Sequence, residues 1–123
     1  KNIKECCLQI VEKHGGAVPA NLEELYALPG VGRKTANVVL GNAFQISSGV
    51  VVDTHVTRLA NRFAWVKTTD AVKIEQILNN ICPKEDWIML SHYLIAHGRA
   101  VCKARNPQCS TCFMNNSCPK RGV

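Results

Sequence analysis

The sequence predicts an all-α fold that ends in a loop of four cysteines. Apolar residues recur at helical spacing along most of the chain, and glycine, proline and capping residues separate these stretches. Only residues 101–123 lack such periodicity. The 123 residues contain no apolar run of the ~18 residues that a membrane span needs, and no charged-then-apolar signal segment. We therefore expect an intracellular protein without a membrane partner.

Three helices are expected in the N-terminal part. Residues 2–14 form the first, which stops at Gly15 and Gly16 and has an apolar face made of Ile3, Cys7, Ile10 and Val11. Asn21 is a plausible N-cap of a short second helix, and Glu24, three residues later, completes a capping box. After a glycine-rich turn, the third helix covers residues 33 to about 44.

Three further helices are expected after the loop at residues 47–49. Residues 50–53, "VVVD", are interpreted as a buried extended connection, because a lone four-residue strand has no partner here. Asp53 then caps a helix to about residue 64, Thr69 starts another that ends before Pro83, and the last covers residues 85–100.

The charge distribution favours a polyanionic partner, most simply nucleic acid. Fifteen Lys and Arg oppose nine acids, which gives a net charge of +6. No acid occurs in residues 87–123, and between residues 29 and 69 the only acid is Asp53. A solvated basic surface without any partner is the alternative.

The four clustered cysteines have the spacing C-x6-C-x2-C-x5-C, at positions Cys102, Cys109, Cys112 and Cys118. A segment this short cannot build a core, whereas four thiolates around a metal centre can order it. Disulfides are the alternative, but the chain has seven cysteines and no secretory signal. The spacing alone leaves zinc and an iron–sulfur cluster equally open. Cys6, Cys7 and Cys82 are expected to be small buried hydrophobic residues.

The stretch "LPGVGRKTANVVL", residues 28–40, predicts a phosphate-binding turn. Gly30 and Gly32 let the backbone turn tightly, and they leave amides at a helix N-terminus available to a phosphate, without reading any base. Helix, glycine-rich hairpin and helix form the helix-hairpin-helix DNA-binding pattern. A turn with only a packing role is the alternative.

Two residues of this region have chemistry beyond packing. Lys34 can serve as a second phosphate contact, or as an amine nucleophile, since its neighbour Arg33 and the helix N-terminus both disfavour the ammonium form. Asp53 can be an N-cap alone, or a cap whose carboxylate also faces a cleft.

These residues together resemble the endonuclease III family of DNA glycosylases, within the helix-hairpin-helix superfamily. The resemblance is carried by "LPGVGRKTANVVL", by "VDTHV" at residues 52–56, by "AHGRAVC" at residues 96–102 and by the four-cysteine loop. It covers nearly the whole chain. It implies a partial helix-hairpin-helix glycosylase fold: a partial helical barrel domain at residues 1–50, with the motif at about 21–44, and a helical domain at residues 51–123.

The resemblance also implies roles for single residues. Lys34 matches the catalytic lysine, which attacks C1′ of a damaged nucleotide and forms a Schiff base, and Asp53 matches the catalytic aspartate. The four cysteines match the ligands of a [4Fe-4S] cluster, at residues 102–118. Contacts with the DNA backbone are expected from Gly30, Gly32, Arg33, Lys103 and Arg105.

The implied function is a bifunctional DNA glycosylase and abasic-site lyase of base excision repair, which removes oxidised pyrimidines. Its partner is double-stranded DNA with an oxidised pyrimidine or an abasic site. We expect a monomer associated with DNA in the bacterial cytoplasm, or in the nucleus or mitochondrion of a eukaryote. Family members are longer at the N-terminus, so the chain is expected to begin partway through the barrel. The alternatives are a non-catalytic DNA-binding module with a structural metal site, and a glycosylase of the adenine-mismatch type.

Overall fold

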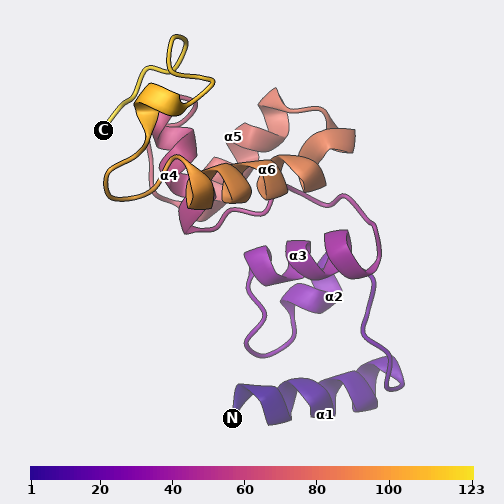
Figure 1. Cartoon of the computed structure of the whole chain (residues 1–123). Coiled ribbons are helices and arrows are strands. Elements are labelled where there is room, and N and C mark those ends of the chain that lie inside the picture. The colour runs from indigo at the N-terminus through magenta and orange to yellow at the C-terminus, as the bar shows by residue number, and fades with distance from the viewer. The chain divides into compact units, whose positions relative to one another are not determined.

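The computed structural model describes residues 1–123 and contains only helices, turns and loops (Figure 1). This confirms the predicted all-α fold. The chain divides into two compact units, Lys1–Ser48 and Gly49–Val123. None of the helices combines the length and the apolar character that crossing a membrane requires. The interpretation of the first unit as part of a barrel domain stays a prediction.

The first unit consists of α1 (Asn2–His14), α2 (Leu22–Tyr26) and α3 (Arg33–Ala43). Helices α2 and α3 pack against each other around a small core of buried apolar side chains: Leu25, Leu28, Ala36 and Leu40. Cys6 and Ile10 of α1 pack against this core. The core therefore holds the hairpin between α2 and α3 in place.

The predicted apolar face of α1 is wrong in part. The structure directs Cys6 and Ile10 to the core, whereas Ile3 and Val11 are 82% and 64% exposed and Cys7 is also exposed. The periodicity of this helix allows two overlapping faces, because apolar residues occupy neighbouring positions at 6 and 7 and at 10 and 11. Only the position of the α2–α3 core decides between them.

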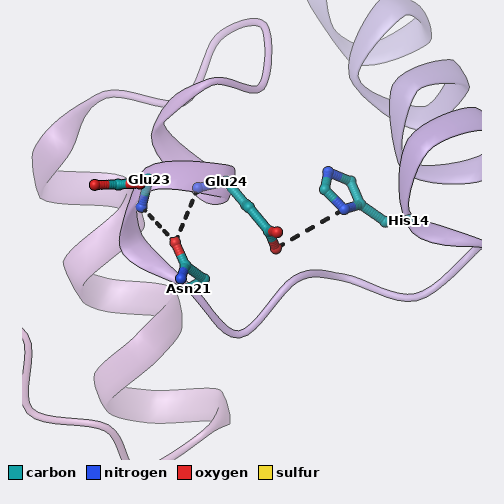
Figure 2. Close-up of polar contacts among 4 residues, drawn as sticks. All are labelled: His14, Asn21, Glu23 and Glu24. Atoms are coloured by element: carbon teal, nitrogen blue, oxygen red, sulfur yellow. Dashed lines mark hydrogen bonds and ion pairs between the residues drawn. The ribbon is translucent and has the colours of Figure 1, made fainter.

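Asn21 caps α2 as expected, but the capping box is incomplete (Figure 2). Its side-chain oxygen accepts hydrogen bonds from the amides of Glu23 at 2.9 Å and Glu24 at 3.2 Å. The Glu24 carboxylate points instead toward His14 at the end of α1, at 3.9 Å. This contact links α1 to α2 when His14 is protonated.

The second unit contains α4 (Thr54–Arg62), α5 (Ala71–Ile81) and α6 (Trp87–Ala100). Short 3-10 turns cover Lys84–Asp86 and Cys109–Thr111. Asp70, and not Thr69, caps α5, because its carboxylate accepts from the amides of Val72 and Lys73. The residues at 84–86, expected partly as α-helix, form the 3-10 turn before α6.

The core of the second unit is larger than that of the first. Helix α4 packs on α6 and on α5. The buried apolar residues are Val50, Val52, Val56, Leu59, Ala60, Phe63, Val66, Ile74, Leu78 and Leu94. The C-terminal loop, yellow in Figure 1, lies beside α4 and the end of α6, and Cys102, Met114 and Cys118 pack against the core. Packing thus helps to order this loop. The sequence had predicted that a metal centre alone would order it.

The segment at residues 50–52 is the expected buried connection and forms no strand. Side chains of α5 and α6 make the hydrogen bonds that a neighbouring strand would otherwise make. The Val50 amide donates to Asn79 Oδ1 and the Val51 amide donates to Ser91 Oγ, both at 2.9 Å. Ser91 Oγ donates in turn to the Val51 carbonyl at 3.1 Å. Buried backbone groups here are satisfied without a sheet.

Candidate nucleic-acid interface and metal centre

The hairpin between α2 and α3 has one position that only glycine suits. Gly30 has φ +80°, and a Cβ there would lie 3.1 Å from Asn2 Cβ of α1. Leu28, two residues earlier, is buried in the core, and its carbonyl accepts from the Val31 amide at 3.1 Å. The hairpin therefore combines a left-handed turn with a close approach of α1.

Gly32 serves a different purpose from Gly30. Its φ of −88° is open to any residue, and a Cβ would meet nothing within 4 Å. It occupies the N-cap position of α3, yet it has no side chain that could cap the first amides. Those amides and the positive end of the helix dipole are left to an external anion.

Arg33 and Lys34 lie in the first turn of α3, as the sequence predicted. Lys34 is exposed, and Arg33 is half-buried. Ala36 and Leu40 are buried on the side of α3 that faces away from Lys34, and they fix the orientation of the helix on the core. The exposed Lys34 thus lies beside the hairpin and the amide end of α3, whereas Arg33 is on the side of the helix that faces the core.

Asp53 lies in the second unit, at the start of α4. It is half-buried, and its Oδ1 accepts a hydrogen bond from the Val56 amide at 2.9 Å. Capping uses this one oxygen of the carboxylate. The structure therefore confirms the capping interpretation and leaves Lys34 and Asp53 in separate compact units.

The four clustered cysteines surround one hollow. Cys102, Cys109, Cys112 and Cys118 are free thiols, and all four line this small hollow, which is partly open to solvent. No group of three or more His, Cys, Asp and Glu side chains is arranged to hold a single metal ion. A cluster of four irons takes one thiolate at each iron, so separate thiols around a space are the donor set that fits it.

Hydrogen bonds reach the sulfur atoms of three of these cysteines. The amides of Met114 and Lys120 donate to the Sγ atoms of Cys112 and Cys118, each at 3.4 Å. The guanidinium of Arg62 donates to Cys102 Sγ at 3.2 Å. Such donors stabilise negative charge on thiolate ligands and influence the potential of a bound cluster.

Two arginines of α4 hold the start of the cysteine loop, and we call them the arginine pair, Arg58 and Arg62. Arg58 donates through Nη2 to the carbonyls of Gly98 and Cys102, at 2.9 Å each. Arg62 is only 7% exposed and donates to the carbonyls of Lys103 at 2.8 Å and Ala104 at 3.2 Å. The pair donates to carbonyls in the last turn of α6 and just beyond its end, where carbonyls lack partners within the helix.

Sequence reasoning missed the arginine pair. The two residues are four apart on α4, and Arg62 lies between the core residues Ala60 and Phe63. A charged residue on the apolar face of a helix is the signal that could have indicated a buried partner. The identity of that partner, a row of carbonyls some forty residues later, is visible only in the fold.

Gly98 allows α6 to approach the arginine pair closely. A Cβ at this position would lie 3.0 Å from Arg58 Nη2 and 3.2 Å from His55 Nδ1. The glycine therefore gives Arg58 access to the helix end. This is a physical reason for glycine in "AHGRAVC".

Lys103 and Arg105 follow the first cysteine and are both exposed. The carbonyl of Lys103 is fixed by Arg62, so the backbone is anchored while the side chain is in solvent. The loop therefore presents cations from an ordered backbone.

The three remaining cysteines are not uniformly buried. Cys6 and Cys82 are half-buried, but Cys7 is exposed, so its interpretation as a buried hydrophobic residue was wrong. Burial raises the pKa of the Cys82 thiol, and the carboxylates of Asp86 and Glu85 raise it further.

Comparison with known proteins identifies both parts of the candidate site. The helix-hairpin-helix motif matches residues 13–41, and the iron–sulfur binding domain of endonuclease III matches residues 102–118. The chain is 52% identical to endonuclease III of Synechocystis over 97% of its own length and 54% of the relative's. Over this span the chain is similar to the endonuclease III family. The cofactor of its cysteine loop is accordingly a [4Fe-4S] cluster.

Further relatives and solved structures match nearly the same part of this chain. Endonuclease III of Escherichia coli is 42% identical over 96% of this chain and 56% of the relative. A solved structure of a trapped endonuclease III–DNA covalent intermediate has a TM-score of 0.91 at 42% identity, over 97% of this chain and 56% of that one. A thermostable thymine-DNA glycosylase has a TM-score of 0.84 at 25% identity and covers 95% of this chain and 55% of its own.

The chain spans about half the length of these relatives. Within that span the fold is the helix-hairpin-helix glycosylase fold with its C-terminal iron–sulfur loop. The resemblance expected from the sequence is confirmed at this level.

Proposed function

We propose that this relative of endonuclease III is a DNA glycosylase and abasic-site lyase of base excision repair, acting on oxidised pyrimidines through Lys34. One observation carries the proposal: an exposed lysine lies in the first turn of α3, next to a hairpin with uncapped helix amides. In a relative that is 42% identical, a covalent intermediate with DNA has been trapped. An amine beside a phosphate-binding turn can supply such a bond.

The hairpin is the proposed grip on the DNA backbone. The amides that Gly32 leaves uncapped bind a phosphate, and Gly30 and Gly32 allow the strand to approach closely. Arg33 adds a cation at the same place. Because these contacts read no base, the lesion is recognised after it leaves the stack, and damaged bases cost less to flip.

The chemistry then uses the lone pair of Lys34 Nζ. Attack on C1′ forms the N–C bond, the glycosidic C–N bond breaks, and its electron pair and a proton leave with the base. The amine gives one proton to the departing base and the other to O4′ as the C1′–O4′ bond breaks, which opens the sugar ring and leaves a Schiff base between Nζ and C1′. Loss of the C2′ proton expels the 3′ phosphate, and hydrolysis of the Schiff base frees Lys34. The strand is cleaved by β-elimination.

Asp53 is the proposed electrostatic partner in this reaction. A carboxylate stabilises the positive charge that develops on the sugar as the base leaves, and it can accept a proton from the amine. Its cap bond to the Val56 amide at 2.9 Å fixes the side chain at the start of α4. Fixed orientation is what electrostatic stabilisation of a transition state requires.

Cys102, Cys109, Cys112 and Cys118 would hold the cluster, because they line one hollow as free thiols. When bound, the cluster supplies a rigid cross-link of the loop, and its iron centres can also exchange an electron. Its proposed role here is structural. An ordered loop holds Lys103 and Arg105 for further phosphate contacts.

Lys34 also separates this proposal from a glycosylase of the adenine-mismatch type. A glycosylase that only removes the base needs no amine nucleophile, whereas a lyase that works through a Schiff base does. A lysine nucleophile therefore favours a bifunctional enzyme, for which oxidised pyrimidines are the proposed substrates.

The test is borohydride trapping of the 123-residue chain on duplex DNA with one abasic site. We expect a covalent adduct with the wild type and none with Lys34→Ala, while duplex affinity changes by less than about threefold. Lys34→Arg should not restore trapping, because a guanidinium is not deprotonated and cannot act as a nucleophile.

Lys73→Ala is the matched control, since Lys73 is an exposed lysine on α5. It should trap as the wild type does. Equal trapping by wild type and Lys34→Ala would remove the nucleophile assignment. Salt-sensitive binding by the wild type without any adduct would support the non-catalytic DNA-binding module instead.

A further inference from the structure

Arg62 of α4 has a nearly buried charge that none of its hydrogen-bond partners balances. Its side chain is 7% exposed. The guanidinium donates to Cys102 Sγ at 3.2 Å, and its other acceptors are backbone carbonyls of residues 102, 103 and 104. No carboxylate is among these acceptors. Because a buried cation is costly unless an anion lies close to it, this position favours a negatively charged neighbour.

The hollow of the four cysteines is the place for such a neighbour. Arg62 lines this hollow together with the four thiols, and no Asp or Glu lines it. Four thiolates outweigh the positive charge of an iron–sulfide core, so a ligated [4Fe-4S] cluster is an anion. The cofactor that fits the thiols would therefore bring its negative charge to the hollow that Arg62 lines.

Arg62 also fixes both ends of the cysteine loop. Its guanidinium binds the backbone of residues 102–104, where the loop begins. Its own carbonyl accepts a hydrogen bond from the Arg121 amide at 3.1 Å, three residues beyond Cys118. One residue of α4 thus holds the two segments that flank the ligands. The contact between its guanidinium and Cys102 Sγ is therefore set by the fold and not by a freely rotating side chain.

Arg58, one turn earlier on α4, provides an internal comparison. It donates to the carbonyls of Gly98 and Cys102, at 2.9 Å each, and it contacts no sulfur. It is half-buried and does not line the hollow. Solvent screens the charge of a partly exposed side chain more than that of a buried one. Of the two arginines, Arg62 is therefore the one whose charge acts on the cluster most directly.

We propose that Arg62 is a positioning residue of the cluster, which orients Cys102 and balances the negative charge of the ligated cluster. A hydrogen bond to a ligand sulfur and a nearby positive charge both stabilise the reduced, more negative form of a cluster. Arg62 therefore raises the reduction potential of the cluster and slows its oxidative loss. This role concerns the cofactor and does not depend on the chemistry proposed for Lys34.

The test places lysine or glutamine at the two arginine positions of the cluster-loaded chain. Protein-film voltammetry measures the reduction potential, and visible absorbance follows cluster loss in ferricyanide. We expect Arg62→Lys to lower the potential, because the planar fork that reaches Cys102 Sγ is lost. Arg62→Gln should lower it further, because the charge is lost as well. Cluster loss should become about tenfold faster or more for Arg62→Gln, since removing an outer-shell partner weakens metal binding by about that factor.

Arg58→Lys and Arg58→Gln are the matched controls, because they remove bonds to carbonyls without touching a sulfur. Their potentials should stay close to that of the wild type. Circular dichroism and iron content check folding and loading. Both lysine variants keep the charge and an aliphatic stem, so both are expected to fold.

Two results would overturn the proposal. One is a potential of Arg62→Lys equal to that of Arg58→Lys. The other is a shift of the same size for the two glutamine variants, which would assign Arg62 to carbonyl capping alone. If Arg62→Gln does not load the cluster, the lysine pair decides. A folded Arg62→Lys without iron, beside a loaded Arg58→Lys, would support the proposal, because the variants differ in the contact with Cys102 Sγ.

Discussion

Asp53 has a structural bond and a proposed chemical role, and single substitutions can separate the two. Its Oδ1 caps α4 by accepting from the Val56 amide. Asparagine keeps an oxygen at this place and is as good an N-cap as aspartate, whereas alanine is not. The charge is therefore the only major property that Asp53→Asn removes.

For Asp53→Asn we expect lyase activity to fall by about 10²-fold or more, with the free energy of unfolding within about 0.5 kcal/mol of the wild type. Asp53→Ala should lose activity similarly and also about 1 kcal/mol of stability, because the cap is lost. Rates of strand cleavage and urea unfolding give the two readouts. Full activity of Asp53→Asn would assign Asp53 to capping alone.

Arg62 is the second residue with a separable role. Its guanidinium binds Cys102 Sγ and the carbonyls of Lys103 and Ala104 from a nearly buried position. For Arg62→Ala we expect a loss of about 3 kcal/mol, because hydrogen bonds from a charged group are lost and buried carbonyls are left without partners. Arg62→Lys should recover only a part, since an ammonium lacks the planar fork.

The measurement for Arg62 is urea unfolding followed by tryptophan fluorescence. Trp65 and Trp87 are the only two tryptophans and both belong to the unit Gly49–Val123, so the signal reports that unit alone. Arg99→Ala, an exposed arginine on α6, is the control and should change stability by less than about 0.5 kcal/mol. If Arg62→Ala unfolded at the same urea concentration as this control, the hydrogen bonds of Arg62 to the start of the cysteine loop would not stabilise the unit.

Among the elements, the hairpin between α2 and α3 shows two glycines with different physical reasons. Gly30 combines φ +80° with a neighbour at 3.1 Å, whereas Gly32 has an ordinary φ and open space in front of it. The sequence could not distinguish them. The difference becomes visible only when the position of Asn2 in α1 and the path of the backbone are known.

Gly30→Ala is therefore predicted to affect mainly stability, and Gly32→Ala mainly the affinity for DNA. Gly30→Ala should destabilise the first unit by about 1–2 kcal/mol, since alanine is strained at positive φ. Gly32→Ala should cost less than about 1 kcal/mol, because alanine is a poorer N-cap than glycine, and should weaken duplex binding severalfold, because a methyl group then stands before the helix amides. Thermal unfolding by circular dichroism and filter binding measure the two effects. Equal DNA affinity of Gly32→Ala and wild type would contradict the phosphate role of these amides.

Most helices were predictable, and the failures have physical causes. Caps and glycine stops indicated α1 to α4 to within a residue or two, and "VVVD" was correctly interpreted as a connection. The prediction of which side of α1 is buried was wrong, because the helix has two overlapping apolar faces and tertiary packing selects one of them. The predicted capping box is incomplete, because the Glu24 carboxylate faces His14 at 3.9 Å. The arginine pair was missed because its partners are backbone carbonyls, which no residue pattern records.

At the scale of the whole molecule, the net charge of +6 governs association with a polyanion. Each neutralised phosphate contributes about 0.9 to the slope of log K against log salt. If Lys103 and Arg105 each contact a phosphate, the variant Lys103→Ala with Arg105→Ala should reduce the slope by about 1.8. Titrations at several salt concentrations measure it, with Lys73→Ala as the unchanged reference. An unaltered slope would place both side chains away from the DNA.

The connection at residues 50–52 has a consequence for observing motion in the C-terminal unit. The Val50 amide depends on Asn79 of α5, whereas the Val51 amide depends on Ser91 of α6. Two adjacent amides are thus protected from deuterium exchange by two different helices. Their exchange rates, resolved for the single amides in one experiment, distinguish loosening of α5 from loosening of α6.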